Sequence, residues 1–204
     1  MDAIKTEKEL VWIQILYLYV VPTLLIYFGV IPGNFRIILL LGISLLMYGI
    51  IKRSNWTYKD MGISIDFMKD IFPYAIFTVI SVISLIFISQ IVTVKPMYEW
   101  WEDARFLLLF IPISFLQEII FRGILMHLLK KAFSSPVFII VLNASVFMLI
   151  HIIYINTSII LPLTFIAGLG FAWIYYKYPN LILVSISHAI LNFTAMILGF
   201  FVLR

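Results

Sequence analysis

Long apolar runs recur along the whole chain, and this pattern constrains the fold more than any other feature. A helix that crosses a bilayer needs about 20 mostly apolar residues, and such segments follow one another here with short polar intervals between them. Hydrophobic residues make up 64% of the 204 and charged residues only 12%. In a soluble domain about 45–50% of the residues are apolar and about 25% are charged. The sequence therefore predicts an all-α, polytopic transmembrane helix bundle with no large soluble domain.

We expect about seven spans in a single transmembrane domain that comprises residues 1–204. The approximate bounds of these spans are 10–31, 35–51, 71–94, 105–128, 136–156, 158–177 and 180–203. The second is short and is consistent with a re-entrant or tilted segment. The longest polar interval, residues 52–70, is consistent with either an ordinary loop or a segment on the membrane surface.

The distribution of Lys and Arg predicts the orientation of the bundle. With the N-terminus inside, nine of the 14 basic residues fall in inner segments and four in outer ones, and Arg122 lies within a span. Because short cytoplasmic loops carry an excess of Lys and Arg, we expect a multi-pass protein of the plasma membrane with a cytoplasmic N-terminus. The high content of Ile, Lys, Tyr and Phe suggests a bacterial source with an A+T-rich genome.

Residues 115–125, FLQEIIFRGIL, place three polar side chains inside a predicted span. A charged group at the centre of a bilayer costs about 2.5–3.5 kcal/mol or more, so Gln117, Glu118 and Arg122 need a physical reason. Glu118 and Arg122 are four residues apart, which allows them to pair on one face of a helix. Gln117 lies about 100° around the helix axis from Glu118 and presents a second face.

Two further spans carry polar groups at a similar depth. His151 ends the sequence FMLIH, and His188 and Asn192 lie one helical turn apart in SHAILN. At a rise of about 1.5 Å per residue, these groups and Gln117 lie about 12–22 Å from the inner ends of their spans. We therefore expect one cavity near mid-membrane that gathers Gln117, Glu118, Arg122, His151, His188 and Asn192. The alternative is a self-neutralising ion pair, with His and Asn as hydrogen bonds between helices.

The residue types in the spans exclude several kinds of intramembrane protease. The chain has no cysteine, which excludes disulfides and a thiol nucleophile, and every Asp lies in a terminus or loop, which excludes an aspartyl protease. The zinc signature H-E-x-x-H is absent, and Ser185 and Ser187 carry no second signature of a serine nucleophile. The remaining chemistry is water activation by a carboxylate and an imidazole, with His and Asn donors at the oxyanion. We leave His127 out of this site because two lysines beside it mark the inner interface.

QEIIFRG, FMLIH and SHAILN resemble the three motifs of the CPBP family, the CAAX proteases and bacteriocin-processing enzymes, also called the Abi family. Those motifs are E-E-x-x-x-R, F-x-x-x-H and H-x-x-x-N/D, and the resemblance extends over about residues 103–194 in the same order and spacing. It implies a type II CAAX-protease-like bundle with its site enclosed at the cytosolic side of the membrane. It also implies an endopeptidase for prenylated, membrane-associated or leader-containing peptides, with bacterial relatives linked to bacteriocin maturation or self-immunity.

Carried over residue by residue, the resemblance gives each polar residue a role. Gln117 stands where the family has the glutamate that activates water, and His151 would share that task. Glu118 with Arg122 would brace the site or hold the substrate. The histidine and asparagine of the third motif would form the oxyanion-binding pair.

The chain therefore departs from the family pattern at its most consequential position. An amide does not readily accept a proton near pH 7, and a general base typically contributes about 10²–10⁴-fold to the rate. Three explanations are open: a deliberately inactivated enzyme, a natural pseudoenzyme, or a variant in which Glu118 or His151 takes over. We favour the first two because Glu118 has Arg122 as a partner and faces away from Gln117.

We expect an intramembrane endopeptidase impaired by Gln117, and the alternative is a non-catalytic peptide-binding or bacteriocin self-immunity protein. A transporter with a Glu/His proton relay is a third possibility, although the sequence shows no repeat symmetry. Two His and one Glu can bind zinc together with water, but the amide of Gln117 is a poor ligand, so we expect no required cofactor. The expected partners are a peptide or protein substrate and the lipid bilayer, and the small net charge of +4 does not favour nucleic acid.

Overall fold

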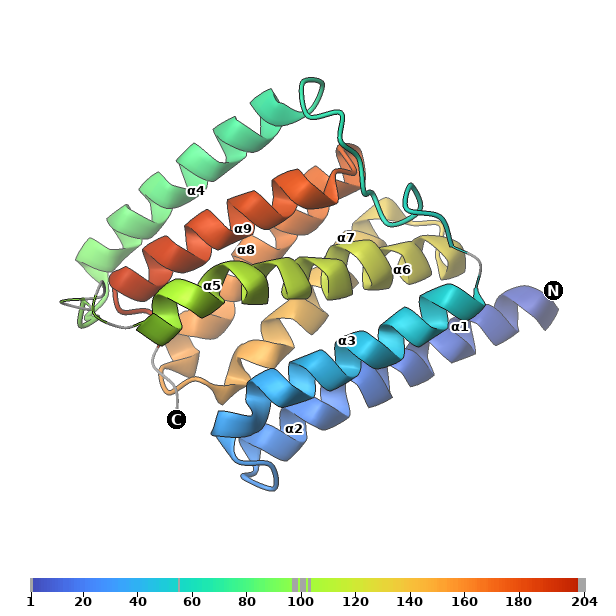
Figure 1. The fold of residues 1–204 in the computed structure, drawn as a ribbon, viewed down its shortest axis with the longest axis horizontal. Helices are drawn as coiled ribbons and strands as arrows, with labels where there is room; N and C mark the ends of the chain where they lie inside the picture. The colour runs from blue at the N-terminus through green and yellow to red at the C-terminus, as the bar shows by residue number, and fades with distance from the viewer. Residues whose placement is uncertain (1, 55, 97–98, 100–101, 103, 202–204) are drawn as a thin grey trace.

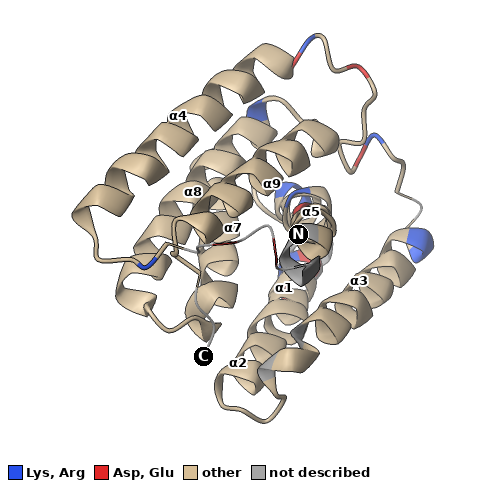
Figure 2. Cartoon of the chain, turned by 60° about the vertical axis from the view of Figure 1, so that its left-hand side comes forward, with Lys and Arg blue, Asp and Glu red and all other residues tan. Residues whose placement is uncertain are grey.

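The computed structural model describes residues 2–54, 56–96, 99, 102 and 104–201, and every regular element in them is a helix. This confirms the predicted fold class. The helices lie in a bundle with a long central helix, a hairpin on one side and the C-terminal helices on the other (Figure 1). Charged residues gather at helix ends and in loops, while the bodies of the helices are almost free of them (Figure 2).

The N-terminal part of the chain forms a helical hairpin. Helix α1 (Asp2–Ile15), the π-helical turn η1 (Leu16–Val20) and α2 (Val21–Tyr27) continue into one another, because the residues at both junctions keep helical backbone angles. After the 3-10 turn η2 (Gly33–Phe35), α3 (Arg36–Arg53) runs back in the opposite direction (Figure 1).

The rest of the chain forms the core around a second continuous helix. Helix α5 (Ala104–Glu118), the π-helical segment η4 (Ile119–Leu125) and α6 (Met126–Ala132) join without a break. The remaining elements are α4 (Ile71–Ile91), α7 (Pro136–Leu149), the 3-10 turn η5 (Ile150–Ile153), α8 (Thr157–Lys177) and α9 (Leu181–Ile197). Helix α9 packs against both α4 and α5, and α7 packs along α8.

Five segments of the described chain are long and apolar enough to cross a membrane, which indicates a multi-pass membrane protein. Two of the roughly seven predicted spans, those at α3 and α9, are too short or too charged to be counted with these five. Helix α3 carries three basic residues in its 18, at positions 36, 52 and 53, and α9 ends at Ile197 before a turn in which Gly199 adopts a positive φ of 84°. The five segments are Glu7–Tyr27, Ile71–Ile91, Leu108–Ala132, Pro136–Ile153 and Thr157–Lys177.

The polar interval before α4 is hydrogen-bonded to the bundle at Met61 and Gly62. Tyr175 Oη donates a hydrogen bond to the Met61 carbonyl at 2.7 Å, and the Leu181 amide donates to the Gly62 carbonyl at 2.7 Å. A side chain at position 62 would collide with the Tyr175 ring, and φ there is 66°. Glycine at this position therefore permits the close contact that ties the loop to α8 and α9.

Candidate active site

A buried carboxylate lies between two basic side chains in the core of the bundle. Glu118 Oε1 accepts a hydrogen bond from Arg122 Nη1 at 2.8 Å and lies 2.6 Å from His188 Nδ1. Glu118 and Arg122 have no exposed surface. Because arginine stays protonated and the ionised carboxylate can only accept, His188 Nδ1 carries the hydrogen of this contact. Glu118 and Arg122 form an ion pair. Together with the hydrogen-bonded His188 they make up one unit from α5, η4 and α9, here called the ion-paired unit.

Aromatic rings enclose the guanidinium of this unit. The centre of the Arg122 guanidinium lies 4.5 Å from the Phe147 ring centroid and 5.2 Å from that of Phe171. Arg122 Nη2 also lies 3.4 Å from the Gly168 carbonyl. A Cβ at Gly168 would lie 3.2 Å from the Ala144 Cα, so α7 and α8 approach closely here. Ring faces attract a desolvated cation, and they contribute to keeping Arg122 charged inside the protein.

The helix between the paired Glu and Arg side chains is widened to a π-helix, and buried donors from other helices hold it. Tyr19 Oη donates to the Ile120 carbonyl at 2.9 Å, and Asn143 Nδ2 donates to the Phe121 carbonyl at 2.8 Å. Both donor side chains are buried. Short π-helical segments are frequent at functional sites. The N-terminal helix and α7 thus fix the backbone that carries the ion-paired unit.

Replacing Tyr19 by Phe is expected to lower the free energy of unfolding by about 1 kcal/mol, since a buried carbonyl loses its donor. Unfolding of the purified protein in mixed detergent micelles measures this. The matched control is Tyr17→Phe, because Tyr17 lies on the same turn with 63% of its surface exposed. Equal effects of the two substitutions would show that the Tyr19 hydroxyl does not support η4.

His151 lies one aromatic ring away from His188. Its Nδ1 is 2.8 Å from the Phe147 carbonyl, and because a carbonyl only accepts, Nδ1 donates and Nε2 of the neutral ring keeps a free lone pair. The Phe147 ring centroid lies 4.9 Å from the His151 ring and 5.5 Å from the His188 ring. The rings of Tyr154 and Phe201 also lie against His151, with centroids 5.8 and 5.9 Å from the centroid of its ring. His151 therefore offers one proton-accepting nitrogen beside the ion-paired unit.

Gln117 precedes Glu118 in α5, and Asn192 lies one turn after His188 in α9. Within the described residues, no hydrogen bond joins either side chain to the two histidines. Asn192 Nδ2 donates to Ser114 Oγ at 3.0 Å, and Ser114 donates to the Phe110 carbonyl at 2.6 Å. The Gln117 side chain is half-buried. Its Oε1 is enclosed and has no hydrogen-bond partner in the described part of the chain. A buried amide oxygen without a donor is one to which a water or a substrate N–H can bind.

The six predicted site residues thus fall into two groups in the structure. Glu118, Arg122 and His188 are in direct contact, with His151 next to them, and this core is sealed from solvent rather than open as a cavity. Sequence analysis missed Tyr19, because a tyrosine in an apolar span has no distinguishing pattern. His127 lies elsewhere, with its ring centroid 4.2 Å from that of Trp56.

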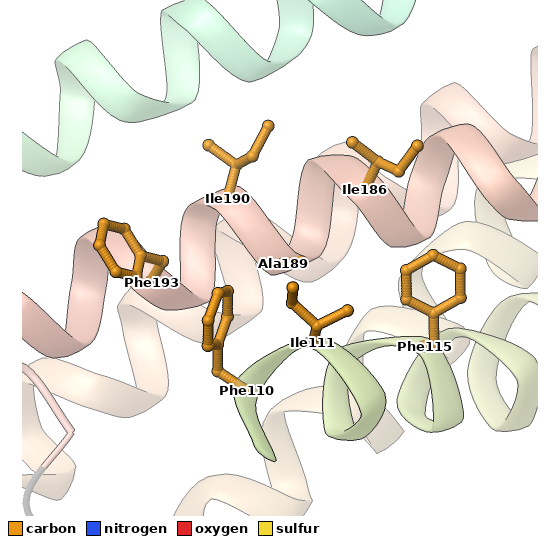
Figure 3. Close-up of a pocket in the computed structure, with 7 residues that line it drawn as sticks. All are labelled: Phe110, Ile111, Phe115, Ile186, Ala189, Ile190 and Phe193. Atoms are coloured by element: carbon orange, nitrogen blue, oxygen red, sulfur yellow. The ribbon is translucent and has the colours of Figure 1, made fainter. Parts of the chain in front are cut away.

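An apolar groove runs between α5 and α9 beside these residues (Figure 3). Its volume is about 350 Å³, and every residue that lines it is apolar. The groove is close in sequence to the candidate site. Phe115 on one wall lies two residues before Gln117, and Ala189 on the other wall directly follows His188. The lining residues are Phe110, Ile111, Phe115, Ile186, Ala189, Ile190 and Phe193.

The donor set of the polar cluster does not form a zinc site with three protein ligands. Among the described residues, no group of three His, Asp or Glu side chains is arranged to hold a metal ion. Glu118 Oε1 and His188 Nδ1 are bonded to each other, and the Nδ1 of His151 is bonded to a backbone carbonyl.

These features define a class of protein: a polytopic helical membrane protein whose helices enclose polar and ionised groups of the kind used in hydrolysis. Residues 99–194, just under half of the chain, match the family model described as type II CAAX prenyl endopeptidase Rce1-like. The matched range contains all three motifs, and the match supports assignment to the family of CAAX-type intramembrane proteases. The comparisons with curated proteins and with solved structures gave no match.

Proposed function

We propose that this chain is an intramembrane endopeptidase in which Gln117 occupies the water-activating position, so that hydrolysis is slow. The observation that carries the proposal is the double engagement of Glu118, whose Oε1 contacts both Arg122 and His188. These two contacts fix the carboxylate between α5 and α9, and Glu118 has no exposed surface. We therefore assign Glu118 a bracing role and not that of the base.

In the proposed reaction, water attacks the scissile carbonyl carbon and gives its proton to His151 Nε2. His151 then returns the proton to the leaving amine as the carbon–nitrogen bond breaks. Gln117 binds the water through its amide and orients it, but it takes no proton. The Nε2–H of His188 and the amide of Asn192 donate to the oxyanion; one such donor is typically worth about 10²–10³-fold in rate.

The groove between α5 and α9 suggests which part of the substrate lies beside the reacting bond. Its lining is wholly apolar and its volume is about 350 Å³. A large apolar side chain of a membrane-associated or leader-containing peptide would be held there by burial of its surface. We propose that this takes place in the plasma membrane of a bacterium, with the N-terminus in the cytoplasm.

The test uses purified protein in lipid vesicles with a set of hydrophobic peptides, and mass spectrometry measures cleavage while retention on the vesicles measures binding. We expect slow cleavage that His151→Ala and Asn192→Ala each reduce at least tenfold, in line with the loss of a base or an oxyanion donor. The control is Asn34→Ala, because Asn34 is exposed in the N-terminal hairpin. Retention of peptide with no cleavage, unchanged by both substitutions, would overturn the peptidase and favour a peptide-binding or self-immunity protein.

A further inference from the structure

A second pocket lies at one end of the bundle, away from the candidate active site. It has a volume of about 200 Å³ and is formed by α1, the end of α3, the segment after it and α6. Its walls include the apolar side chains of Leu10 and Ile50. Five side chains bring polar groups to it: Glu7, Gln14, Ser54, Trp56 and Lys131.

Two of these polar groups are enclosed without a hydrogen-bond partner among the described residues. They are the Oε1 of Gln14, which needs a donor, and the Nε1–H of Trp56, which needs an acceptor. Burial of a polar atom without a partner is unfavourable, so both positions favour a polar ligand. The pocket thus offers a donor and an acceptor at the same time.

The charges in the pocket have the same dual character. Glu7 supplies a carboxylate and Lys131 an ammonium group, whose Nζ lies 5.4 Å from the Trp56 ring centroid. A purely anionic ligand would be repelled by Glu7, and a purely cationic one by Lys131. A ligand with a cationic N–H group next to an anionic oxygen group would match both charges and both unpaired atoms.

The pocket lies at the boundary between the apolar part of the bundle and its polar end. The candidate span Glu7–Tyr27 begins at one of its residues, and the span Leu108–Ala132 ends at another. Basic residues occupy the last turns of α3 and α6 here. Phospholipid head groups lie at this depth, and Trp and Lys are enriched there.

We propose that this pocket binds the head group of phosphatidylethanolamine. The lipid ammonium donates to Glu7 and to Gln14 Oε1, and the phosphate accepts from Trp56 Nε1–H and from Lys131. The acyl chains lie along the apolar walls beside Leu10 and Ile50. Phosphatidylcholine has no ammonium N–H to donate to Glu7 and Gln14, and phosphatidylglycerol offers them only neutral hydroxyl groups.

Native mass spectrometry of the full chain, purified in detergent and titrated with each lipid, tests this proposal. We expect phosphatidylethanolamine to bind about tenfold more tightly than phosphatidylcholine, as the gain of charge-assisted hydrogen bonds implies. Glu7→Gln and Gln14→Leu should remove that preference, and Trp56→Phe should weaken the binding of both lipids. The matched controls are Glu9→Gln and Trp173→Phe, because Glu9 and Trp173 are exposed and do not line the pocket.

Thermal unfolding of each variant, followed by circular dichroism, separates loss of binding from loss of fold. Weaker binding at an unchanged unfolding temperature supports the site. Equal binding of the three lipids, a preference for phosphatidylglycerol, or a preference that survives Glu7→Gln would overturn it. Soluble phosphoethanolamine that competes at the same concentration as the lipid would overturn the membrane-lipid assignment. None of these outcomes depends on hydrolytic activity, so this proposal and the peptidase proposal can fail separately.

Discussion

Replacing Gln117 by Glu is expected to raise the rate of peptide hydrolysis by about 10²- to 10⁴-fold, the usual contribution of a general base. Glutamate has nearly the shape of glutamine, and the enclosed Gln117 Oε1 has no protein hydrogen bond in the described chain that the change would break. The new carboxylate can take a proton from bound water together with His151 Nε2. Mass spectrometry of peptide cleavage in vesicles measures the gain.

The control for this substitution is Gln117→Ala, which removes the amide without supplying a base and should not exceed the rate of the natural chain. Adding His151→Ala to Gln117→Glu should remove most of the gain, because the two groups act on one water. If Gln117→Glu leaves the rate unchanged while Glu118→Gln abolishes cleavage by the natural chain, Glu118 is the base and the proposed roles are reversed.

The fold class could be predicted because its physical cause is local. Twenty apolar residues in sequence require a helix in the membrane, where each backbone group must find its partner within the segment. The ends of the spans were harder to predict, since basic residues that flank an apolar run do not show where the helix leaves the bilayer. For this reason α3 and α9 were predicted as spans, although α3 carries basic residues at both ends and α9 stops at Ile197.

The candidate site shows the same division between local and distant contacts. The pairing of Glu118 with Arg122 follows from their spacing, and the structure has it at 2.8 Å even though the turn between them is π-helical. The contact between Glu118 and His188 spans 70 residues, and it depends on how α5 and α9 are rotated about their axes, which no single sequence reveals. The same holds for Tyr19, whose hydroxyl reaches η4 from a helix outside the three motifs.

Replacing Arg122 by Met is expected to lower the free energy of unfolding by about 3–5 kcal/mol. Methionine fills much of the same volume, so the effect comes from charge. Glu118, which has no exposed surface, loses its arginine and keeps His188 as its one hydrogen-bond partner among the described residues. Unfolding in mixed detergent micelles measures the loss. Arg53→Met is the matched control, because Arg53 is exposed at the end of α3 and its loss should change stability by less than about 0.5 kcal/mol.

The double variant Glu118→Gln with Arg122→Met separates the pair from its environment. Removing both charges together removes the unpaired carboxylate, so the double variant should be more stable than Arg122→Met alone, as found when buried ion pairs are replaced as a unit. A double variant as unstable as the sum of the two single ones would mean that each residue acts through separate contacts. The ion pair would then not be what stabilises this part of the α5–η4 helix, and the bracing role assigned to Glu118 would have to be abandoned.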